Sequence, residues 1–286
     1  MKSCFFLNGI AIIITWLIAT AAIAAQITVR VDSRGDANAV YALEMIRLAL
    51  DKTGGDYEIS INDAEVSALR MRMQTLEGKT DVFWTATSTD LEEEFLPVRV
   101  PLYKGLLGYR IFIIHKDNKN LFSNVKTFKD LDAFSFGQGR GWTDTTIMEA
   151  NGLKVTQVTK YHGLFYMADG KRFDAFPRGV NEPWTEIKSR PDLDLTVDEN
   201  LMFVYKMPYY LLVSPNRKSL AKRLDRGLKI AISDGSFDEI FFNNETVKLV
   251  AEKAKLSGRK IFNLDNPDLP PNTPLTDESL WFNVAM

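Results

Sequence analysis

The sequence predicts an α/β fold built from two similar units, and three observations lead to this prediction. Residues 27–84 show strand and helix patterns in the order strand–helix–strand–helix–strand, which is typical of a parallel sheet covered by helices. A second pattern of the same kind, about 90 residues long, follows further along the chain. The composition, 45% apolar and 25% charged over 286 residues, is that of a globular protein rather than a disordered or fibrous one.

Charge and cysteine content exclude several classes of function. The net charge of −2 gives no excess of Lys and Arg to attract phosphate, so no nucleic-acid partner is expected. The chain has one Cys, Cys4, and two His, His115 and His162, so a zinc site with four Cys and His ligands cannot be built. The two histidines are interpreted as surface or boundary residues, and neither a metal nor a cofactor is expected.

Residues 1–25 have the pattern of a cleavable signal peptide. Lys2 is the only charged residue before an apolar run over residues 10–25, which ends in small residues. This run is shorter than the roughly 20 residues that a membrane-spanning helix needs. Cleavage after Ala24 is therefore expected rather than an uncleaved anchor, which places the mature chain, without Cys4, in the periplasm.

The first unit is expected to contain three strands and two helices. Strands are predicted where apolar residues alternate or run together, at residues 27–31, 57–61 and 81–84. Helical spacing of apolar residues predicts one helix over residues 39–52 and another that begins after Asp63 as its N-cap. The buried face of the second helix is expected to consist of Val66, Leu69, Met73 and Leu76.

The second unit and the C-terminal part are predicted in the same way. A strong strand is expected within residues 106–115, and further strands at 134–136, 155–158, 173–176 and 209–213. Helices are expected at residues 143–150, 163–168 and 219–233, followed by a short aromatic helix. Residues 137–141 are interpreted as a glycine loop. Residues 263–286 are expected to form an irregular tail anchored by Trp281 and Phe282.

Several short segments carry a resemblance when they are taken in order. They are Gly-Lys-Thr-Asp-Val-Phe-Trp at 78–84, the polar loop at 85–89, Gly-Lys-Arg-Phe-Asp-Ala-Phe at 170–176, the return strand at 208–214 and the Asp-Gly helix region at 230–241. This series, within residues 26–242, resembles the extracytoplasmic solute-binding proteins of the type 2 periplasmic-binding-protein fold. It is most similar to the family 3 branch, which includes polar amino-acid receptors of ABC importers.

The resemblance implies a two-lobed protein in which each lobe is a sheet flanked by helices. Residues 26–110 and 205–262 would form the first lobe, residues 111–204 the inserted second lobe, and residues 263–286 the tail. The hinge would lie near residues 109–115 and 204–213. It further implies a monomer that captures a small solute in the cleft and passes it to an ABC permease or a membrane sensor, without being an enzyme.

Two departures from the family pattern mark a divergent member. Amino-acid receptors usually carry an Arg shortly after the ligand loop, but residues 90–94 are Asp-Leu-Glu-Glu-Glu. They also carry an Asp soon after the Asp-Ala segment, where residues 177–181 are Pro-Arg-Gly-Val-Asn. Both halves of the clamp that holds an α-amino acid are therefore missing, and the resemblance supports fold and compartment better than it supports amino-acid binding.

Candidate ligand-binding residues come from loops at the carboxyl ends of predicted strands, where ligands bind in open α/β sheets. They are Arg34; then Trp84, Thr85, Thr87 and Ser88; then Arg140, Trp142 and Thr143; and finally Arg178. An aromatic face beside hydroxyls suits a small polar ligand. Each loop also has a structural interpretation: Asp36 could simply cap the helix that follows, Trp84 could be a core residue with a Ser or Thr of its loop as a helix cap, and Asp144 could cap the next helix.

The charge of these residues suggests a hypothesis about the ligand. Glycine amides at a helix start, with Arg140 beside them, would attract an anion. Arg140 and Arg178 without a partner Asp therefore favour an anionic solute.

Two other kinds of function stay open at this point. One is a periplasmic cyclohexadienyl-dehydratase-like enzyme, for which Glu182, Asp144 or Lys104 would be the general acid. The other is a sensor or interaction protein that keeps the fold without a transport role.

Overall fold

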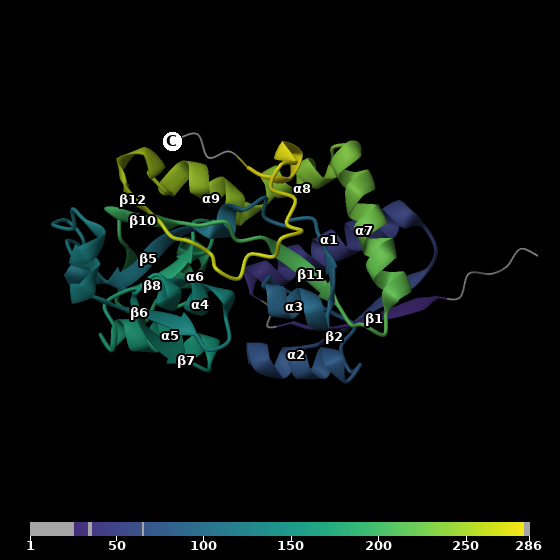
Figure 1. Cartoon of the computed structure of the whole chain (residues 1–286), viewed down its shortest axis with the longest axis horizontal. Helices are drawn as coiled ribbons and strands as arrows, with labels where there is room; N and C mark the ends of the chain where they lie inside the picture. The colour runs from purple at the N-terminus through teal and green to yellow at the C-terminus, as the bar shows by residue number, and fades with distance from the viewer. Residues whose placement is uncertain (1–25, 34–35, 65, 283–286) are drawn as a thin grey trace, which may run out of the picture.

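The computed structural model describes residues 26–33, 36–64 and 66–282, and every structural statement below refers to these residues. The predicted signal peptide and the candidate site residue Arg34 lie outside the described residues. Two lobes lie side by side along the long axis of the molecule (Figure 1). Within the described residues, no helix combines the length and the apolar character that a membrane crossing requires.

A parallel pair of strands and a helix open the first lobe. Strand β1 (Ile27–Asp32) pairs in parallel with β2 (Tyr57–Asn62), and helix α1 (Ala37–Thr53) connects them. Asp36 caps this helix, because its carboxylate accepts a hydrogen bond of 2.9 Å from the N–H of Ala39. These three elements confirm the sequence prediction.

An antiparallel sheet completes the first lobe and corrects the prediction that β3 continues a parallel sheet. Strand β11 (Tyr209–Val213) returns from the second lobe and lies between β3 (Val82–Ala86) and β4 (Leu96–Val98), antiparallel to both. The short helix α3 (Thr89–Glu94) connects β3 to β4. A strand that returns from far along the chain leaves no local pattern that reveals its partners, so the sequence could not show this insertion.

Helix α2 (Ala68–Leu76) differs from the prediction in its start and in its buried face. Its N-cap is Ser67 rather than Asp63. The three helical residues expected in the buried face are exposed, namely Leu69, Met73 and Leu76. The buried residues are Met71 and Thr75, because the helix meets the sheet through its other side, where Met71 joins an apolar cluster with β3 and β11.

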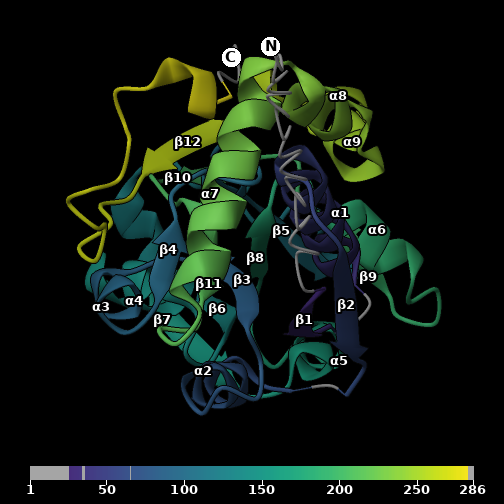
Figure 2. The same ribbon diagram turned by 90° about the vertical axis from the view of Figure 1, so that its right-hand side faces the viewer.

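Long helix α7 (Lys218–Ser233) packs against α1 and lies over β11 and β4 (Figure 2). At the crossing with α1, a Cβ on Gly227 would lie only 2.0 Å from the carbonyl oxygen of Ala49, so the two helix backbones touch. Helices α8 (Ser236–Asn243) and α9 (Glu245–Lys253) follow. The predicted amphipathic and aromatic helices are confirmed, and α9 is an additional element.

The central strand of the second lobe is β5 (Tyr109–His115). The strand order of its sheet is β12-β10-β5-β8, and β9 also pairs with β5. The other members are β8 (Phe176–Gly179), β9 (Leu195–Val197), β10 (Leu201–Val204) and β12 (Lys260–Asn263). Strand β12 therefore lies on the same sheet as β5. The division into lobes at residues 110/111 and 204/205 stays a prediction.

A second, parallel pair of strands in this lobe is β6 (Ser135–Gly139) and β7 (Lys154–Val158). The helices of the lobe are α4 (Thr143–Ala150), α5 (Tyr161–Asp169) and α6 (Pro183–Lys188). The strand expected at residues 173–176 begins only at Phe176, as β8. Short 3₁₀ segments connect other elements: η1 (Leu106–Gly108), η2 (Lys116–Asn118), η3 (Phe128–Ala133) and η4 (Leu256–Gly258).

The predicted glycine loop at residues 137–141 is wrong, because Gly137 and Gly139 belong to β6. A Cβ on Gly137 would lie 2.3 Å from the ring of Phe173, and one on Gly139 would lie 2.2 Å from the ring of Trp142. The glycines therefore make room for aromatic rings packed on the strand. Their spacing reflects side-chain packing rather than a loop that cradles a ligand.

Two segments, residues 99–108 and 205–208, cross between the lobes. They meet where the N–H of Tyr205 donates to the carbonyl oxygen of Gly108 at 3.0 Å. A Cβ on Gly108 would lie 2.1 Å from the carbonyl oxygen of Tyr205, so only glycine permits this approach. Residues 99–108 lie just before the first predicted hinge segment, residues 109–115. Residues 205–208 lie at the start of the second, residues 204–213.

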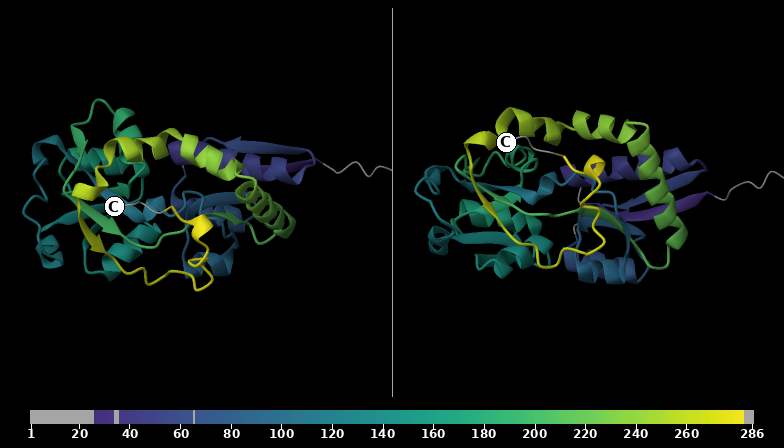
Figure 3. Two further views of the ribbon diagram at one scale, coloured as in Figure 1. Left: turned by 90° about the horizontal axis from the view of Figure 1, so that it is seen from above. Right: turned by 45° about the horizontal axis from the view of Figure 1, so that its top comes forward.

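After β12 the chain is irregular, as predicted, and returns to the first lobe. The yellow segment in Figure 1 and in the right panel of Figure 3 runs from β12 across the molecule to the short turn η5 (Glu278–Leu280). The ring of Trp281 lies against Gly105, and the N–H of Phe282 donates to the carbonyl oxygen of Lys104 at 2.7 Å. These contacts confirm the predicted anchors.

Candidate ligand-binding site

A cavity of about 90 Å³ lies between the two lobes. The first lobe contributes the end of β3 and the start of α1, and the second lobe contributes the starts of α4 and α5 and part of β8. Strand ends and helix starts meet here, which is where α/β folds place their ligands.

The first-lobe wall carries an aromatic ring, a hydroxyl and an amide. Trp84 and Thr85 come from the last part of β3, and Asn38 comes from the first turn of α1. The hydroxyl of Tyr103 donates to the amide oxygen of Asn38 at 2.7 Å, which fixes the orientation of that side chain. The amide nitrogen of Asn38 is thereby directed to an acceptor on the other lobe.

The second-lobe wall is aromatic around one arginine. Trp142 precedes α4, Tyr161 begins α5, and Arg178 lies on β8. The guanidinium carbon of Arg178 lies 5.4 Å from the centre of the Trp142 ring and 5.8 Å from that of Tyr161. This arrangement is a cation–π environment, which stabilises the position of Arg178.

Arg178 also has two carboxylate partners. This corrects the hypothesis from the sequence, in which Arg178 had no acidic partner. Its Nη2 lies 2.6 Å from an oxygen of Glu182 and 2.6 Å from an oxygen of Glu186, and all three side chains are buried. The hydroxyl of Tyr161 donates to Glu186 at 2.6 Å. The chain turns back after β8 into α6, and this turn brings both carboxylates to the arginine.

Burial affects the two carboxylates differently. Burial raises the pKa of Glu182, and the nearby charge of Glu186 adds to this shift, although Arg178 and Arg110 oppose it. Burial acts on Glu186 as well, but the ion pair with Arg178 and the hydrogen bond from Tyr161 outweigh it, so the pKa of Glu186 is lowered.

Arg110 is a site residue that the sequence analysis missed. It lies on β5, is almost fully buried and lines the cavity. Its Nη2 lies 3.1 Å from a carboxylate oxygen of Asp144, which also accepts a hydrogen bond from the hydroxyl of Tyr205. An arginine inside the apolar run of residues 106–115 was the available signal, because a buried charge requires a partner.

Direct hydrogen bonds between the lobes border the cavity. The hydroxyl of Thr143 donates to the carbonyl oxygen of Ala86 at 2.9 Å. The amide nitrogen of Asn38 donates to a carboxylate oxygen of Glu182 at 2.7 Å. The structure therefore has the lobes in contact at the cavity.

Five of the predicted site residues line this cavity: Trp84, Thr85, Trp142, Thr143 and Arg178. Thr87 does not line it and is buried, with its hydroxyl bonded to Glu92 at 3.2 Å. Ser88 is the N-cap of α3. Arg140 is exposed and lies outside the cavity lining. Thr87 and Ser88 lie outside the lining because β3 ends at Ala86 and the chain then turns away into α3.

The predicted anion site of glycine amides is not formed. The N–H of Gly137 donates to the carbonyl oxygen of Ala175 at 2.9 Å. The N–H of Arg140 donates to the carbonyl oxygen of Val158 at 2.9 Å. Backbone donors already used within the lobe cannot turn toward a ligand. Asp144 does not cap α4 with its side chain either, since its carboxylate binds Arg110.

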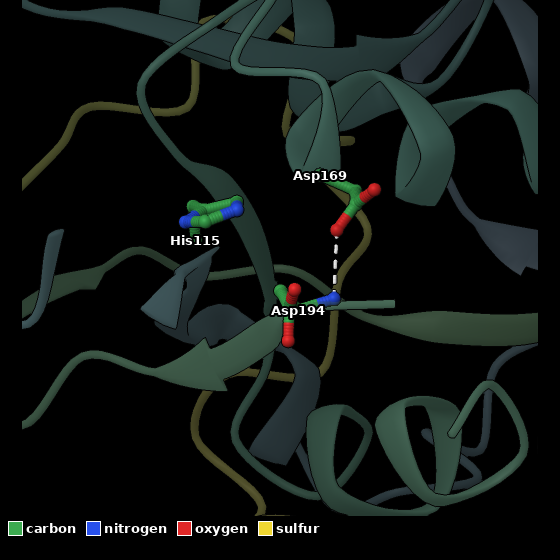
Figure 4. A group of neighbouring side chains, drawn as sticks. All are labelled: His115, Asp169 and Asp194. Atoms are coloured by element: carbon green, nitrogen blue, oxygen red, sulfur yellow. Dashed lines mark hydrogen bonds between the residues drawn. The ribbon is translucent and has the colours of Figure 1, made fainter. Parts of the chain in front are cut away.

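One group of side chains on the second lobe has the composition of a metal site. Ligand atoms of His115, Asp169 and Asp194 lie within 4.8 Å of one another (Figure 4). Each already has a protein partner: Asp169 accepts from the N–H of Asp194 at 2.7 Å, Asp194 pairs with Lys116 at 3.2 Å, and His115 accepts from the N–H of Asp117 at 3.1 Å. We assign no metal to this group, and none of the three residues lines the cavity.

Three solved structures illustrate the fold that this chain shares with known proteins. An ancestral arginine-binding protein with bound glutamine has a TM-score of 0.58 and 17% identity, covering 77% of this chain and 98% of that one. A structure described with glutathione import through GshT and the cystine ABC importer TcyBC of Streptococcus mutans has a TM-score of 0.59 and 14% identity, covering 77% and 95%. The GluR0 ligand-binding core of Nostoc punctiforme with L-glutamate has a TM-score of 0.55 and 13% identity, covering 77% and 99%.

The chain has the two-lobed fold of these binding proteins. The predicted fold class is confirmed, and so is the resemblance to the type 2 periplasmic-binding-protein fold. No protein-family model and no curated protein matches the sequence. Identities of 13–17% with the solved structures fit a divergent member of this fold group.

Proposed function

We propose that the protein binds a small polar solute reversibly in the cavity between its lobes. The observation that carries this proposal is the lining, in which Trp84 and Thr85 of one lobe share a cavity with Trp142 and Thr143 of the other. Aromatic faces beside hydroxyls suit a small molecule that needs orienting hydrogen bonds. A site made by two lobes also couples binding to hinge closure.

The proposed role is delivery of the solute to an ABC-type permease, or recognition of the closed form by a membrane sensor. The Streptococcus mutans structure is described together with an ABC importer, and the ancestral arginine-binding protein holds glutamine. The signal-peptide pattern of residues 1–25 supports a periplasmic location for this role. Purification of the exported protein and its intact mass would test cleavage after Ala24.

The proposed solute is polar, without the anionic character that the sequence suggested. That hypothesis rested on Arg140 and Arg178 as cations without partners. Arg140 lies outside the cavity lining, and Arg178 is paired with Glu182 and Glu186. The basis for selecting an anion is therefore lost.

An α-amino acid is one class to test rather than part of the proposal. In the stretch where amino-acid receptors carry an arginine, Glu92 pairs with Arg99 at 2.5 Å. The cavity instead offers Arg110 and Glu182, a base and an acid from other positions of the chain. Both are already bonded within the protein, so a solute would have to share or displace those bonds.

A thermal-shift screen tests the proposal directly. The exported protein would be screened against amino acids, carboxylates and phosphorylated metabolites, and hits would be confirmed by isothermal titration. A ligand that binds only the folded form raises the melting temperature, by an amount that grows with concentration above Kd. Absence of any stabilising solute across these classes would contradict the proposal.

Two tryptophan variants locate the binding site. Trp142 and Trp184 are both half-buried in the second lobe, but only Trp142 lines the cavity. Trp142→Ala is expected to weaken solute binding at least about tenfold, because it removes an aromatic wall. Trp184→Ala is the matched control and is expected to keep the affinity. Equal losses in both variants would place the solute elsewhere.

The enzyme alternative keeps one supporting feature. Glu182 lines the cavity with a raised pKa, as a general acid requires, and Asp144 lies near it. Lys104 is not in the cavity lining and pairs with Asp238 at 2.5 Å. Both oxygens of Glu182 accept hydrogen bonds from Asn38, Arg178 or the backbone, which favours a structural role. Turnover of prephenate or arogenate would decide for the enzyme.

A further inference from the structure

Residues 264–268, here called the strap, leave the second lobe directly after β12 and cross to the first lobe. At their start, the N–H of Leu264 donates to the carbonyl oxygen of Val204 at 2.9 Å. Asp265 is held by two bonds to Asn151: its N–H donates to the amide oxygen at 3.0 Å, and its carbonyl accepts from the amide nitrogen at 2.8 Å. Asn151 is the C-cap of α4, so the strap is bound to the end of that helix.

The other end of the strap is bound to the start of α3 in the first lobe. The carbonyl oxygen of Asp268 accepts from the N–H of Thr89 at 3.1 Å and from its hydroxyl at 3.3 Å. Thr89 is the first residue of α3, whose N–H has no partner inside the helix. The strap supplies that partner. Between its ends, Asn266 donates to the carbonyl oxygen of Lys206, where the chain crosses between lobes.

The short length of the strap limits how far the two helices can separate. Only three peptide steps connect Asp265 to Asp268, and an extended chain covers at most about 11 Å over three residues. While both ends stay bonded, the separation between the end of α4 and the start of α3 is limited to that reach plus the lengths of the hydrogen bonds at the two ends. Both helices are close in the chain to residues that line the cavity. Thr143 of the lining is the first residue of α4, and Thr85 of the lining is four residues before the start of α3.

We propose that the strap holds the cleft closed in the absence of solute, so that opening requires the bonds at Asn151 or at Thr89 to break. The inference rests on the two-lobed fold and on these contacts, and it does not require the proposed solute. A hinge motion that separates α3 from α4 extends the strap and then breaks its bonds at one end. The strap thereby biases the hinge toward the closed arrangement.

The distance between the lobes can be measured with a pair of spin labels. Cys4 is the only cysteine of the chain, so Cys4→Ser with Arg70→Cys and Thr159→Cys gives one label on each lobe. Both label positions are exposed, in α2 and in the turn before α5. Pulsed dipolar spectroscopy of the full chain without solute then reports the distribution of lobe separations.

Two variants release the strap at opposite ends. Thr89→Pro removes both donors to Asp268, and proline is well tolerated at the first residue of a helix. Ser88 before it is extended, with φ −146° and ψ 167°, as a residue before proline requires. Asn151→Ala removes both bonds to Asp265. Each variant is expected to shift the main distance peak to longer values.

Two matched controls separate release of the strap from other effects. Thr89→Ala removes the hydroxyl but keeps the N–H that donates to Asp268, so it is expected to keep most of the wild-type distribution. Asn244→Ala removes a capping asparagine at α9, away from the strap, and is expected to leave the distances unchanged. A similar shift in Asn244→Ala would indicate loosening of the whole molecule and would overturn the proposal.

Wild-type distances in either release variant, with cooperative thermal unfolding, would overturn the proposal. If one release variant does not fold, the other decides, because the two act on different elements. The measurement is made without solute, so its failure is separate from a failure of the solute screen. Longer distances between the labels in the release variants, together with a negative solute screen, would support the proposed role of the strap and contradict the proposed function.

Discussion

At the scale of single residues, a buried cluster of charges surrounds Arg178 in the second lobe. This arginine, Glu182 and Glu186 are buried together, so each charge has lost its hydration and depends on the others. Removal of one partner leaves uncompensated charge in the interior. Arg140, the other arginine expected at the site, is exposed and has its side chain in solvent.

Substitution of the two arginines is therefore expected to have very different effects. Arg178→Ala leaves two buried carboxylates without their cation and should lower the free energy of unfolding by about 3–5 kcal/mol. Arg140→Ala, the matched control, should change it by less than about 0.5 kcal/mol. Urea denaturation followed by circular dichroism measures both values. Equal effects would show that the buried ion pairs are not the source of the stability.

A second residue-scale prediction concerns pH. Asp234, between α7 and α8, binds Lys52 at 2.6 Å and accepts a hydrogen bond from Ser236. These contacts lower the pKa of Asp234 to about 2. A carboxylate with a depressed pKa in the folded state stabilises the protein above its unfolded pKa of about 4, and this contribution is lost as the pH falls toward 2.

Asp234→Asn keeps an acceptor for Ser236 but removes the charge. The melting temperature of the wild type should exceed that of the variant by a constant amount above about pH 5, and the difference should shrink between pH 4 and 2. Lys52→Gln is the control that removes the partner and should behave similarly. A difference that is as large at pH 2 as at pH 6 would contradict the assignment to this carboxylate.

At the scale of elements, backbone contact between α1 and α7 shapes the first lobe. These helices have their closest approach at Gly227, next to the carbonyl of Ala49. Only a residue without a side chain lets two helices pack at this distance. Helix α2 is packed less closely than α1 and α7. Its apolar residues Leu69, Met73 and Leu76 are exposed, and the helix contacts the apolar cluster through Met71.

Gly227→Ala is expected to destabilise the first lobe. The new methyl group would lie 2.0 Å from the carbonyl oxygen of Ala49, so the helices would have to move apart. Overpacking of this kind typically costs about 1–3 kcal/mol. The matched control is Gly258→Ala, where a Cβ meets nothing within 4 Å. Calorimetric unfolding should show a lower melting temperature for Gly227→Ala alone.

At the scale of the whole molecule, side-chain hydrogen bonds connect the lobes. Thr143 and Asn38 provide two of them at the cavity, and the strap adds a connection outside it. Because single hydrogen bonds are weak, changes at them should alter the balance between open and closed arrangements. The same balance would be shifted by a solute that contacts both walls.

Two threonine variants of α4 test this expectation. Thr143 donates across the cleft to Ala86, whereas Thr145 donates to Gly139 within its own lobe at 2.8 Å. Valine has the shape of threonine without the hydroxyl. Thr143→Val is expected to lengthen the distance between the labels at residues 70 and 159, and Thr145→Val is expected to leave it unchanged. Unchanged distances in both variants would show that the Thr143 bond does not hold the lobes together.

Local patterns in the sequence were sufficient for elements whose residues repeat with a regular period. Helix α1 with its Asp36 cap, helix α7 and strands β1, β2 and β11 follow from such patterns. Short elements such as α3, α6 and β9 were missed, because three to six residues are too few for a period to appear. For the site, the sequence placed Trp84 and Trp142 in one cavity.

The partners of each charged group depended on the tertiary structure. Arg110 and Asp144 are 34 positions apart and meet only because the fold brings β5 and the start of α4 to the same cavity. Arg178 has its carboxylates only because the chain turns back after β8. The sequence by itself determined the fold class and several aromatic residues of the cavity, since hydrophobic periodicity is local. Which charges neutralise each other, and how the lobes are held together, was decided by the tertiary structure, since both depend on packing between elements and on an irregular turn, and neither repeats with a period in the sequence.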